Sequence, residues 1–453
     1  MRRRRQKKVE QVKRPLRAAE TRTRRLHLLG GLILWVSTLY CAPSTRKKGK
    51  SRGAHGGGLH PELAVLGFHA GRSAALASRI ARQSTWMPSF EVARQELDRG
   101  GLKLNIKVVR GTTHGVGHQL LIARRSDLER YRNGEIPAGT AFAGKRLVAQ
   151  LDGGRIRLRK VTRKQRGKGK HKKQKRRYKG QWREPKLLTI FEIDKQGQMI
   201  RKTRAWIDGT FAGPDEVMEL LAMHLHRLGA AQAEVVAFLA DGAPWIWDRL
   251  DWVVKRVGLD PKKVAYTLDW CHALHHVGLA LAAVGLPADE HRRVFKKLRK
   301  WLKQGWAAKA LNELERLGQK GGVLEAMVTP VAYLDKHLAA GHLDYAKMQE
   351  RGLPIGSGAI ESAIRRVVNQ RLKGNGLMWC EENAEGMLLL RAAALTGRWE
   401  EAMTRAVQSK WEDGRRPWDW VSPDMPFQLK EEFAIAPPVP QPQTTQQDRR
   451  IPA

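Results

Sequence analysis

The feature that most constrains the fold is an alternation of strand-like and helix-like segments between residues 145 and 285. KRLVAQLDGGRIRLRK (145–160) has the pattern of a strand, a glycine turn and a second strand, and residues 186–195 and 198–207 predict two more strands. Helices and buried strands then alternate along residues 214–228, 233–242, 243–257, 263–270 and 271–285. This order predicts an α/β domain with a mixed sheet flanked by helices.

A helical region precedes this domain. Residues 59–140 have helical spacing, and within them 89–101 and 102–117 predict two helices joined by a glycine turn. Three basic residues fall in the second of these segments: Lys103, Lys107 and Arg110. A helix-turn-helix of this kind indicates a DNA-binding region, although helix pairs joined by glycine also occur in helical domains without that role.

The α/β pattern is interrupted after its first part, which we place at residues 145–287. Residues 288–351 are helical and polar and contain no strand candidate, so they predict a helical insertion. The core resumes in residues 352–410, after a Gly-Ser-Gly turn. Residues 1–58 form a basic arm and linker, and the Pro/Gln-rich residues 435–453 are expected to be disordered.

The net charge indicates a polyanionic partner. The 453 residues include 84 Lys+Arg against 44 Asp+Glu, a formal charge of +40. Nucleic acid is the expected partner because each neutralised phosphate releases counterions. An RNA-binding ribosomal or chaperone-like protein, or one that coats acidic membranes, fits the charge equally well. The three cysteines are far apart, so we expect no disulfide framework and a reducing cytosol.

An apolar run from Leu26 to Tyr40 follows the arginine-rich arm and is similar to the apolar part of a signal peptide. It is shorter than the about 20 residues of a membrane-spanning helix, and His27, Ser37 and Thr38 dilute it. We therefore expect a short strand or a buried hairpin here. The protein as a whole is expected to be cytoplasmic and nucleoid-associated, without a membrane partner.

Three acidic residues stand out because each lies at the edge of an apolar segment beside glycine. Asp152 ends the segment LVAQLDGG, Asp241 ends VVAFLADG, and Glu361 opens a helix after GSG. A carboxylate at a strand end lies at the rim of a sheet, where glycine lets a substrate approach closely. Taken singly, each Asp-Gly is equally consistent with an ordinary turn.

Three carboxylates at one sheet rim would suit a hard divalent cation. Mg²⁺, or Mn²⁺, prefers oxygen ligands. Two such ions about 3.5–4 Å apart promote in-line phosphoryl transfer. We therefore predict a site for two ions at Asp152, Asp241 and Glu361.

Four segments resemble bacterial insertion-sequence transposases of the DDE type, most closely the Kra-type branch and more loosely the Mutator group. They are LDGGRIRLR (151–159), ADGAPWIWDRL (240–250), LDWCHALHH (268–276) and GLPIGSGAIESAIRRVVNQRLKGNGLMW (352–379). The likeness covers about residues 60–400. The last segment is the most specific because it combines Gly-Ser-Gly, a glutamate, a basic helix, Arg-Leu-Lys and Met-Trp.

The resemblance implies that Asp152, Asp241 and Glu361 are the first, second and third catalytic acids of an RNase H-like fold. The helical region would be inserted before the last acid. The implied function is a DNA transposase that cleaves transposon ends and transfers the strands into target DNA. The implied partners are the terminal inverted repeats, the target DNA and further copies of the chain assembled on DNA.

Two features depart from this family. Related members carry an N-terminal cysteine pair, whereas this chain has Cys41 and places Ser44 where a second cysteine would stand, which puts a structural zinc site in doubt. A very basic insertion, residues 161–180, separates Asp152 from the strand at 186. It fits a solvated loop, but its charge density favours contact with phosphates.

A cluster of potential ligands follows the last predicted strand: Asp269, Cys271, His272, His275 and His276. A zinc site there would lack a fourth ligand, and the adjacent Cys271 and His272 would diverge on a helix. We interpret Asp269 and His272 as residues that support the acids or contact DNA, with helix packing as the alternative for His272. Asp269, or Asp208 in WIDGT, is the substitute if one of the three acids is misassigned.

The helix that opens at Glu361 is basic, with four cationic residues: Arg365, Arg366, Arg371 and Lys373. Such a helix would hold the phosphates of the scissile strand, although surface salt bridges would explain some of these residues. Trp245 and Trp247 follow Asp241 and fit either stacking on bases or core packing, which is the more frequent role.

Three other functions share part of this pattern. An RNase H-like nuclease would use the same acids without joining strands, and a domesticated, catalytically dead chain would keep only DNA binding. A basic RNA-binding scaffold would show no preference for terminal repeats. Mg²⁺-dependent cleavage of the flanking DNA ends, followed by strand-transfer products, separates these functions.

Overall fold

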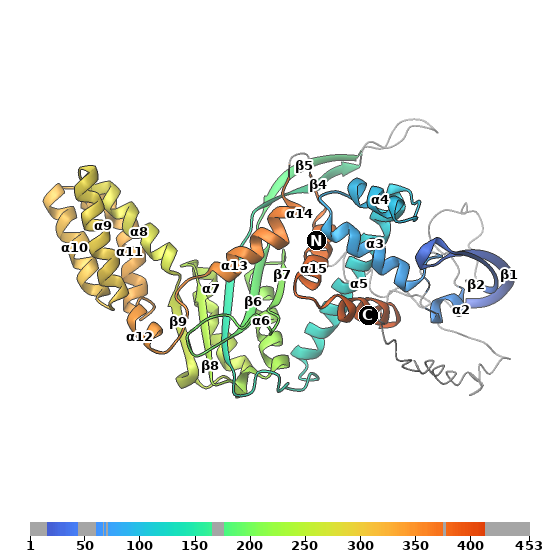
Figure 1. The fold of residues 1–453 in the computed structure, drawn as a ribbon, viewed down its shortest axis with the longest axis horizontal. Coiled ribbons are helices and arrows are strands. Elements are labelled where there is room, and N and C mark those ends of the chain that lie inside the picture. Colours follow the sequence, from blue (N-terminus) through green and yellow to red (C-terminus); the bar gives the residue numbers. More distant parts are fainter. Residues whose placement is uncertain are drawn as a thin grey trace, which may run out of the picture. The chain divides into compact units, whose positions relative to one another are not determined.

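The computed structural model describes residues 16–43, 60–66, 68, 71–164, 176–374 and 377–412 (Figure 1). The chain divides into two compact units. One comprises residues 1–24, 37–66 and 414–453, and the other comprises residues 25–36 and 67–413. The first part of the predicted basic arm, the predicted linker, the centre of the basic insertion and the predicted disordered tail lie outside the described residues.

The larger unit is built around a sheet of five strands: β3 (Arg146–Gly153), β6 (Lys186–Ile193), β7 (Trp206–Thr210), β8 (Val235–Ala240) and β9 (Val264–Leu268). Their order across the sheet is β7-β6-β3-β8-β9. β3 and β9 both pair in parallel with β8, whereas β6 pairs antiparallel with β3 and with β7. The sheet is therefore mixed, which confirms the α/β prediction.

Two helices cover one face of this sheet: α6 (Pro214–Leu228) and α7 (Pro244–Val257). Both begin with proline, which suits a first helical turn because no N–H is needed there. Both end at glycines with left-handed φ, 79° at Gly229 and 76° at Gly258. All six residues of β8 are buried, so its alternate side chains enter cores on both faces of the sheet.

The opposite face is covered by residues from the end of the predicted insertion and from the segment just after it, among them Met348, Leu353 and Ala359. Three short helical segments continue from there: α13 (Gly358–Ala363), a π-helix (Ile364–Asn369) and α14 (Gln370–Leu372). Buried side chains of these segments join a core with the base of β4 and with α15.

Helices near both ends of the larger unit pack together: α3 (Ala74–Trp86), α4 (Phe90–Arg99), α5 (Ile106–Arg132), α15 (Glu381–Leu395) and α16 (Trp399–Glu412). The predicted helix pair at 89–117 is confirmed, but its second helix starts at Ile106 and continues to Arg132. α5 crosses α15 where Gly117 meets Gly386, because a Cβ at Gly117 would lie 3.0 Å from the Gly386 backbone. Much of α5 is therefore committed to packing.

The segment predicted as a helical insertion is helical: α8 (Trp270–Val284) leads into α9 (Ala288–Lys303), α10 (Ala307–Gly321), α11 (Leu324–Ala339) and α12 (Tyr345–Glu350). These helices share a core of their own with Leu268 at the end of β9. Figure 1 shows α9, α10 and α11 gathered beside α8. Short 3-10 helices occur at Ala230–Gln232 and Pro261–Lys263.

One strand prediction needs correction. Residues 198–207 were expected to be a strand, but β7 occupies Trp206–Thr210, and within 198–205 only Met199 makes a single β-bridge, to Ile193. The second strand after Asp152 does not join the main sheet. It forms a separate two-stranded ribbon, β4 (Ile156–Lys164) with β5 (Arg176–Arg183), which includes the described part of the basic insertion.

The apolar run near the N-terminus belongs to a hairpin of β1 (Leu16–His27) and β2 (Ile33–Pro43), joined through a 3-10 turn at Leu29–Gly31. A buried hairpin was one of the two structures expected here. The hairpin is present, but the expectation that it is buried is wrong, because Trp35 is 69% exposed and Leu32 is 56% exposed. The short helix α2 (Pro61–Val65) follows. Within the described ranges, the search for a helix with the length and apolar character of a membrane span finds none.

Candidate active site

Asp152 and Asp241 end neighbouring parallel strands at one edge of the sheet. Leu151 of β3 lies opposite Ala240 of β8, so the two aspartates follow at the same level. Neighbouring strands are about 4.8 Å apart, which places the two backbones side by side. Both aspartates are half-buried. Asp152 Oδ1 accepts from the Gly153 amide at 2.5 Å, and Asp241 Oδ1 accepts from the Ala243 amide at 3.1 Å.

Gln150 hydrogen-bonds to the backbone beside the third acid and so holds that segment at this edge of the sheet. It is a polar residue in the middle of an apolar strand and is 1% exposed. Its Oε1 accepts from the Ile360 amide at 2.9 Å, and its Nε2 donates to the Gly356 carbonyl at 3.3 Å. The backbone at Glu361, the residue after Ile360, is therefore held beside β3. Its Oε1 accepts from Ser357 Oγ at 3.2 Å, and its side chain is exposed.

Asp152 is affected by burial and by the charges of the other two acids. The pKa of Asp152 is raised to about 6, mainly by burial and also by the charges of Asp241 and Glu361, against the opposing effects of the Gly153 amide and His272. Burial also raises the pKa of Asp241. A buried carboxyl beside other carboxylates favours the proton because the charged form is destabilised. This edge of the sheet would therefore be stabilised by a cation.

Asp269 and His272 lie beside the acids, as the sequence predicts. Asp269 is fully buried at the start of α8, and its Oδ2 accepts from His272 Nδ1 at 2.8 Å and from the His272 amide at 2.9 Å. Its Oδ1 accepts from the Ser357 amide at 2.6 Å. Burial alone would raise the pKa of Asp269, but these hydrogen bonds lower it. Both carboxylate oxygens are thus engaged, which suits a supporting role better than metal ligation.

His272 is a basic residue at this edge of the sheet, and its surroundings favour the protonated imidazole. The hydrogen bond with Asp269 raises the pKa of His272, and the charges of Asp269, Asp241 and Asp152 raise it further against the effect of burial. Its side chain is 41% exposed, so the imidazole is accessible to a substrate. Asp269 links this histidine to Ser357 and, through the Ser357 hydroxyl, to Glu361.

The helical insertion contributes a side chain that sequence reasoning missed. The ring of Tyr333 in α11 packs against Gly242, where an added Cβ would lie 2.2 Å from the tyrosine hydroxyl. Tyr333 in turn stacks on His276 with ring centroids 3.6 Å apart. The signal in the sequence is Gly242, directly after Asp241, because a residue without a side chain leaves room for the Tyr333 ring. The insertion therefore forms one side of the candidate site.

Trp247 packs as a core residue. Its Nε1 donates to the Asp241 carbonyl at 2.6 Å, and its ring stacks on His342 at 4.0 Å. Trp245 is partly buried, with Lys186 Nζ 4.3 Å from its ring centroid. For Trp247 the packing alternative holds, because hydrogen bonding and stacking already occupy the indole.

Most of the predicted DNA-binding residues are exposed: Arg365, Arg366, Lys373, Lys103, Lys107 and Arg110. Lys103 lies before α5 rather than on it. Arg371 is a correction, because it is 1% exposed and its guanidinium lies 4.8 Å from the ring centroid of Phe90 and 5.0 Å from that of Trp379. Burial lowers the pKa of Arg371 to about 10. It is a core residue that is not accessible to phosphate.

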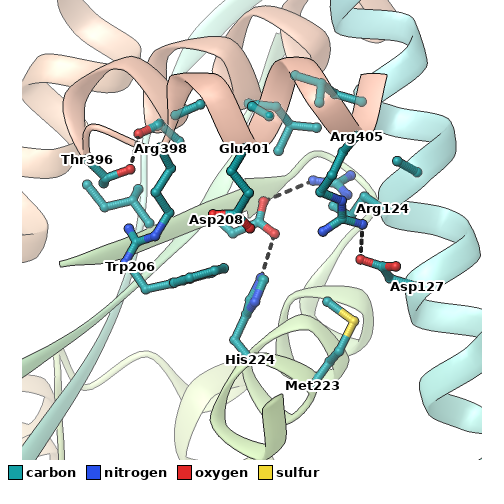
Figure 2. A pocket seen from close by; sticks show the side chains of 17 residues that line it. Arg124, Asp127, Trp206, Asp208, Met223, His224, Thr396, Arg398, Glu401 and Arg405 are labelled. Carbon is teal, nitrogen blue, oxygen red and sulfur yellow. Dashed lines mark hydrogen bonds and ion pairs between the residues drawn. The ribbon is translucent and has the colours of Figure 1, made fainter. Parts of the chain in front are cut away.

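Asp208, the substitute acid from WIDGT, lies in a different environment. Figure 2 shows its carboxylate between Arg124 and His224 beside a cavity of about 110 Å³. Asp208 Oδ1 is 3.2 Å from Arg124 Nη1, and Oδ2 is 2.8 Å from His224 Nε2. Burial alone would raise the pKa of Asp208, but Arg124 and His224 lower it. A carboxylate neutralised in this way is not a metal-ligand candidate.

Within the described ranges, no group of three or more histidine, cysteine, aspartate or glutamate side chains is placed to hold a metal ion. Asp152, Asp241 and Glu361 belong to the same edge of the sheet, but they do not form such a group. Comparisons with protein-family models, with curated proteins and with solved structures find no match for this chain.

Proposed function

We propose that this chain is a DDE-type DNA transposase whose five-stranded sheet is an RNase H-like catalytic core. The observation that carries the proposal is the placement of Asp152 and Asp241 at one level on paired parallel strands, with Glu361 tied to the same strand through Gln150. Three acids distant in sequence are thereby brought to one edge of the sheet, as an enzyme of this type requires.

The chemistry of the donor set fits hard divalent cations. Carboxylate oxygens are the ligands that Mg²⁺ and Mn²⁺ prefer, and the raised pKa of Asp152 reflects negative charge that a cation would compensate. Asp152, Asp241 and Glu361 would hold two such ions. When bound, the ions activate the attacking oxygen and stabilise the leaving oxygen of a phosphoryl transfer. Glu361 is exposed, so its carboxylate can turn toward a cation without leaving a packed core.

The remaining residues would bind and position DNA. Arg365 and Arg366 lie on the π-helix that directly follows the α13 segment of Glu361, and both are exposed, so they would hold phosphates next to the acids. His272 would contact the scissile strand, with Asp269 fixing the orientation of its ring. The partners would be the terminal inverted repeats and target DNA, on which copies of the chain would assemble. The formal charge of +40 supports such a partner.

The test is cleavage of a plasmid that carries the flanking DNA ends, with Mg²⁺ and the full chain. We expect Asp241→Asn to reduce cleavage by at least about 100-fold, because one charged ligand is lost. Asp289→Asn is the matched control, since this aspartate is 94% exposed on α9. Equal cutting by the native chain and Asp241→Asn would show that the acids are misassigned.

The products of the same reaction separate the other functions. Joined donor–target molecules support a transposase, whereas cleavage without joining supports a nuclease. DNA binding with no cleavage by the native chain in Mg²⁺ or Mn²⁺ supports a catalytically dead DNA-binding protein. Binding to RNA and DNA alike, without preference for the terminal repeats, supports a basic scaffold.

A further inference from the structure

The ribbon of β4 and β5 starts and ends beside the candidate acids. Arg155 is three residues after Asp152, and the Gly154 amide donates to the Pro185 carbonyl at 2.9 Å, which closes the base of the ribbon. Glu184, just after β5, is close enough for its charge to raise the pKa of Asp241. Whatever lies on the base of the ribbon is therefore adjacent to the candidate site.

One face of the ribbon is anchored in the core. Ile156 is fully buried and Leu158 is 3% exposed. Leu158 bridges to Trp379, whose carbonyl accepts from the Arg159 amide at 2.7 Å. Side chains alternate along a strand, so the residues between these apolar ones point to the other face.

That other face carries arginines and exposed aromatic rings. Arg157 lies opposite Trp182 and Arg159 lies opposite Gly180 in the strand register, so these residues share a face, and Tyr178 joins them two residues before Gly180. Trp182 is 52% exposed and Tyr178 is 50% exposed. We call Arg155, Arg157, Arg159, Tyr178 and Trp182 the arginine–aromatic face.

Two of the three arginines lie over the aromatic rings of this face. The Arg155 guanidinium lies 5.0 Å from the Trp182 ring, and the Arg159 guanidinium lies 5.1 Å from the Tyr178 ring. The segments RIRLRK and YKGQWR contain no acidic residue. Among the ion pairs between described residues, none engages these three arginines. The arginine–aromatic face thus offers positive charge and flat apolar rings without an internal counter-charge.

We infer that the arginine–aromatic face binds unpaired DNA that continues from the strand held at Asp152 and Asp241. Aromatic rings and guanidinium planes both stack on bases, and guanidiniums also pair with phosphates. Stacking on a ring requires an unpaired base, because the faces of paired bases are covered by their neighbours. A strand that is opened beside the cleavage site would supply such bases. This inference rests on the proposed function for the identity of the nucleic acid.

The test is fluorescence anisotropy of labelled oligonucleotides with the full chain, in EDTA so that no cleavage occurs. A single-stranded thymidine oligomer and a duplex of the same length are compared. We expect Trp182→Ala and Tyr178→Ala each to weaken binding to the single strand about tenfold, with little change for the duplex. Trp252→Ala is the matched control, because this tryptophan is 44% exposed on α7, outside the ribbon.

Salt dependence separates the two kinds of contact. The aromatic variants should keep the native slope of log K against log salt, whereas Arg157→Gln should reduce the slope for the single strand by about 0.7. Trp182→Phe should retain most of the affinity, and an unchanged thermal melt shows that each variant is folded. Native affinity of the alanine variants for the single strand, or equal losses for single strand and duplex, would overturn the inference.

Failure of this inference and failure of the proposed function are distinguishable. If Asp241→Asn cuts as well as the native chain while Trp182→Ala loses single-strand binding, only the catalytic assignment is wrong. If Asp241→Asn is inactive while Trp182→Ala binds normally, only the role of the arginine–aromatic face is wrong.

Discussion

Asp208 with His224 and Asp269 with His272 form two aspartate–histidine pairs at the same end of the sheet. In both pairs the carboxylate and the imidazole nitrogen are 2.8 Å apart. The strand register places Asp208 level with Leu188 and, through it, with Leu151, while Asp269 follows Leu268. Their local geometry is alike, and the difference lies in what surrounds them.

Arg124 accounts for the difference. Its guanidinium contacts Asp208, donates to the Gly209 carbonyl at 2.7 Å and pairs with the buried Glu385. Thr210 Oγ1 also donates to Glu385, at 2.7 Å. The Asp208 pair is therefore enclosed and neutralised. The pKa values of Asp269 and His272 are instead set mainly by burial and by the hydrogen bonds of Asp269 to His272 and Ser357, and at the histidine also by the charges of Asp241 and Asp152. One pair stabilises the fold, whereas the other is available for chemistry.

Replacing the arginine should have the largest effect. Arg124→Met leaves Asp208 and Glu385 buried without their cation, and we expect a loss of about 3–5 kcal/mol in the free energy of unfolding. Urea denaturation followed by circular dichroism measures it. The matched control is Arg132→Met, whose ion pair with Glu219 is half-exposed and should contribute at most about 1 kcal/mol. A loss from Arg124→Met no larger than this control would show that the Asp208 network is not a structural element.

Substitutions of the two histidines should differ in their effects, one on activity and the other on stability. We expect His272→Asn to lower the cleavage rate about 10–100-fold with a change in unfolding free energy below about 1 kcal/mol, because its ring is accessible and supports the acids. His224→Asn should instead destabilise the protein by about 1–3 kcal/mol, since Asp208 loses a buried partner. Cleavage assays and urea melts on both variants measure the contrast. The reverse pattern, with His224→Asn inactive yet stable, would contradict the assignment.

The aspartates at this edge should differ in the sign of their effect on pH-dependent stability. Burial raises the pKa of folded Asp152 from 3.8 to about 6, so the free energy of unfolding should fall as pH rises from about 4 to about 6. Asp152→Asn removes that fall and should stabilise the protein at pH 7 by about 1–2 kcal/mol, a value reduced for solvent screening. Mg²⁺ should stabilise the native chain more than this variant.

Asp208 should show the opposite dependence of stability on pH, because its pKa is lowered. Its lowered pKa contributes stability above about pH 4 that is lost as pH falls through the folded value, so Asp208→Asn should destabilise the protein at pH 7. Thermal melts of the native chain and both variants across pH 4–8 test the pair. Stabilisation by Asp208→Asn, or destabilisation by Asp152→Asn, would contradict the distinction between the two sites.

Much of the architecture follows from short-range patterns in the sequence. The alternation of apolar segments and helices predicts the mixed sheet, the helical insertion and the ends of β3 and β8 at Asp152 and Asp241. These predictions succeed because the periods of strands and helices are local properties. The strand at 198–207 was misplaced because tertiary pairing with β6 selects Trp206–Thr210 instead.

The sequence by itself determined where acids stand beside glycine, but only the tertiary structure decided which of them are available for chemistry. Asp208 within β7 and Asp241 just after β8 both precede glycine, yet Arg124, 84 residues away from Asp208, neutralises only that one. Gln150 reaches the segment of Glu361 across 210 residues, and Arg371 is buried by rings from distant segments. Long-range packing sets the charge around each carboxylate, because electrostatic interactions depend on distance in space and on burial rather than on spacing along the chain.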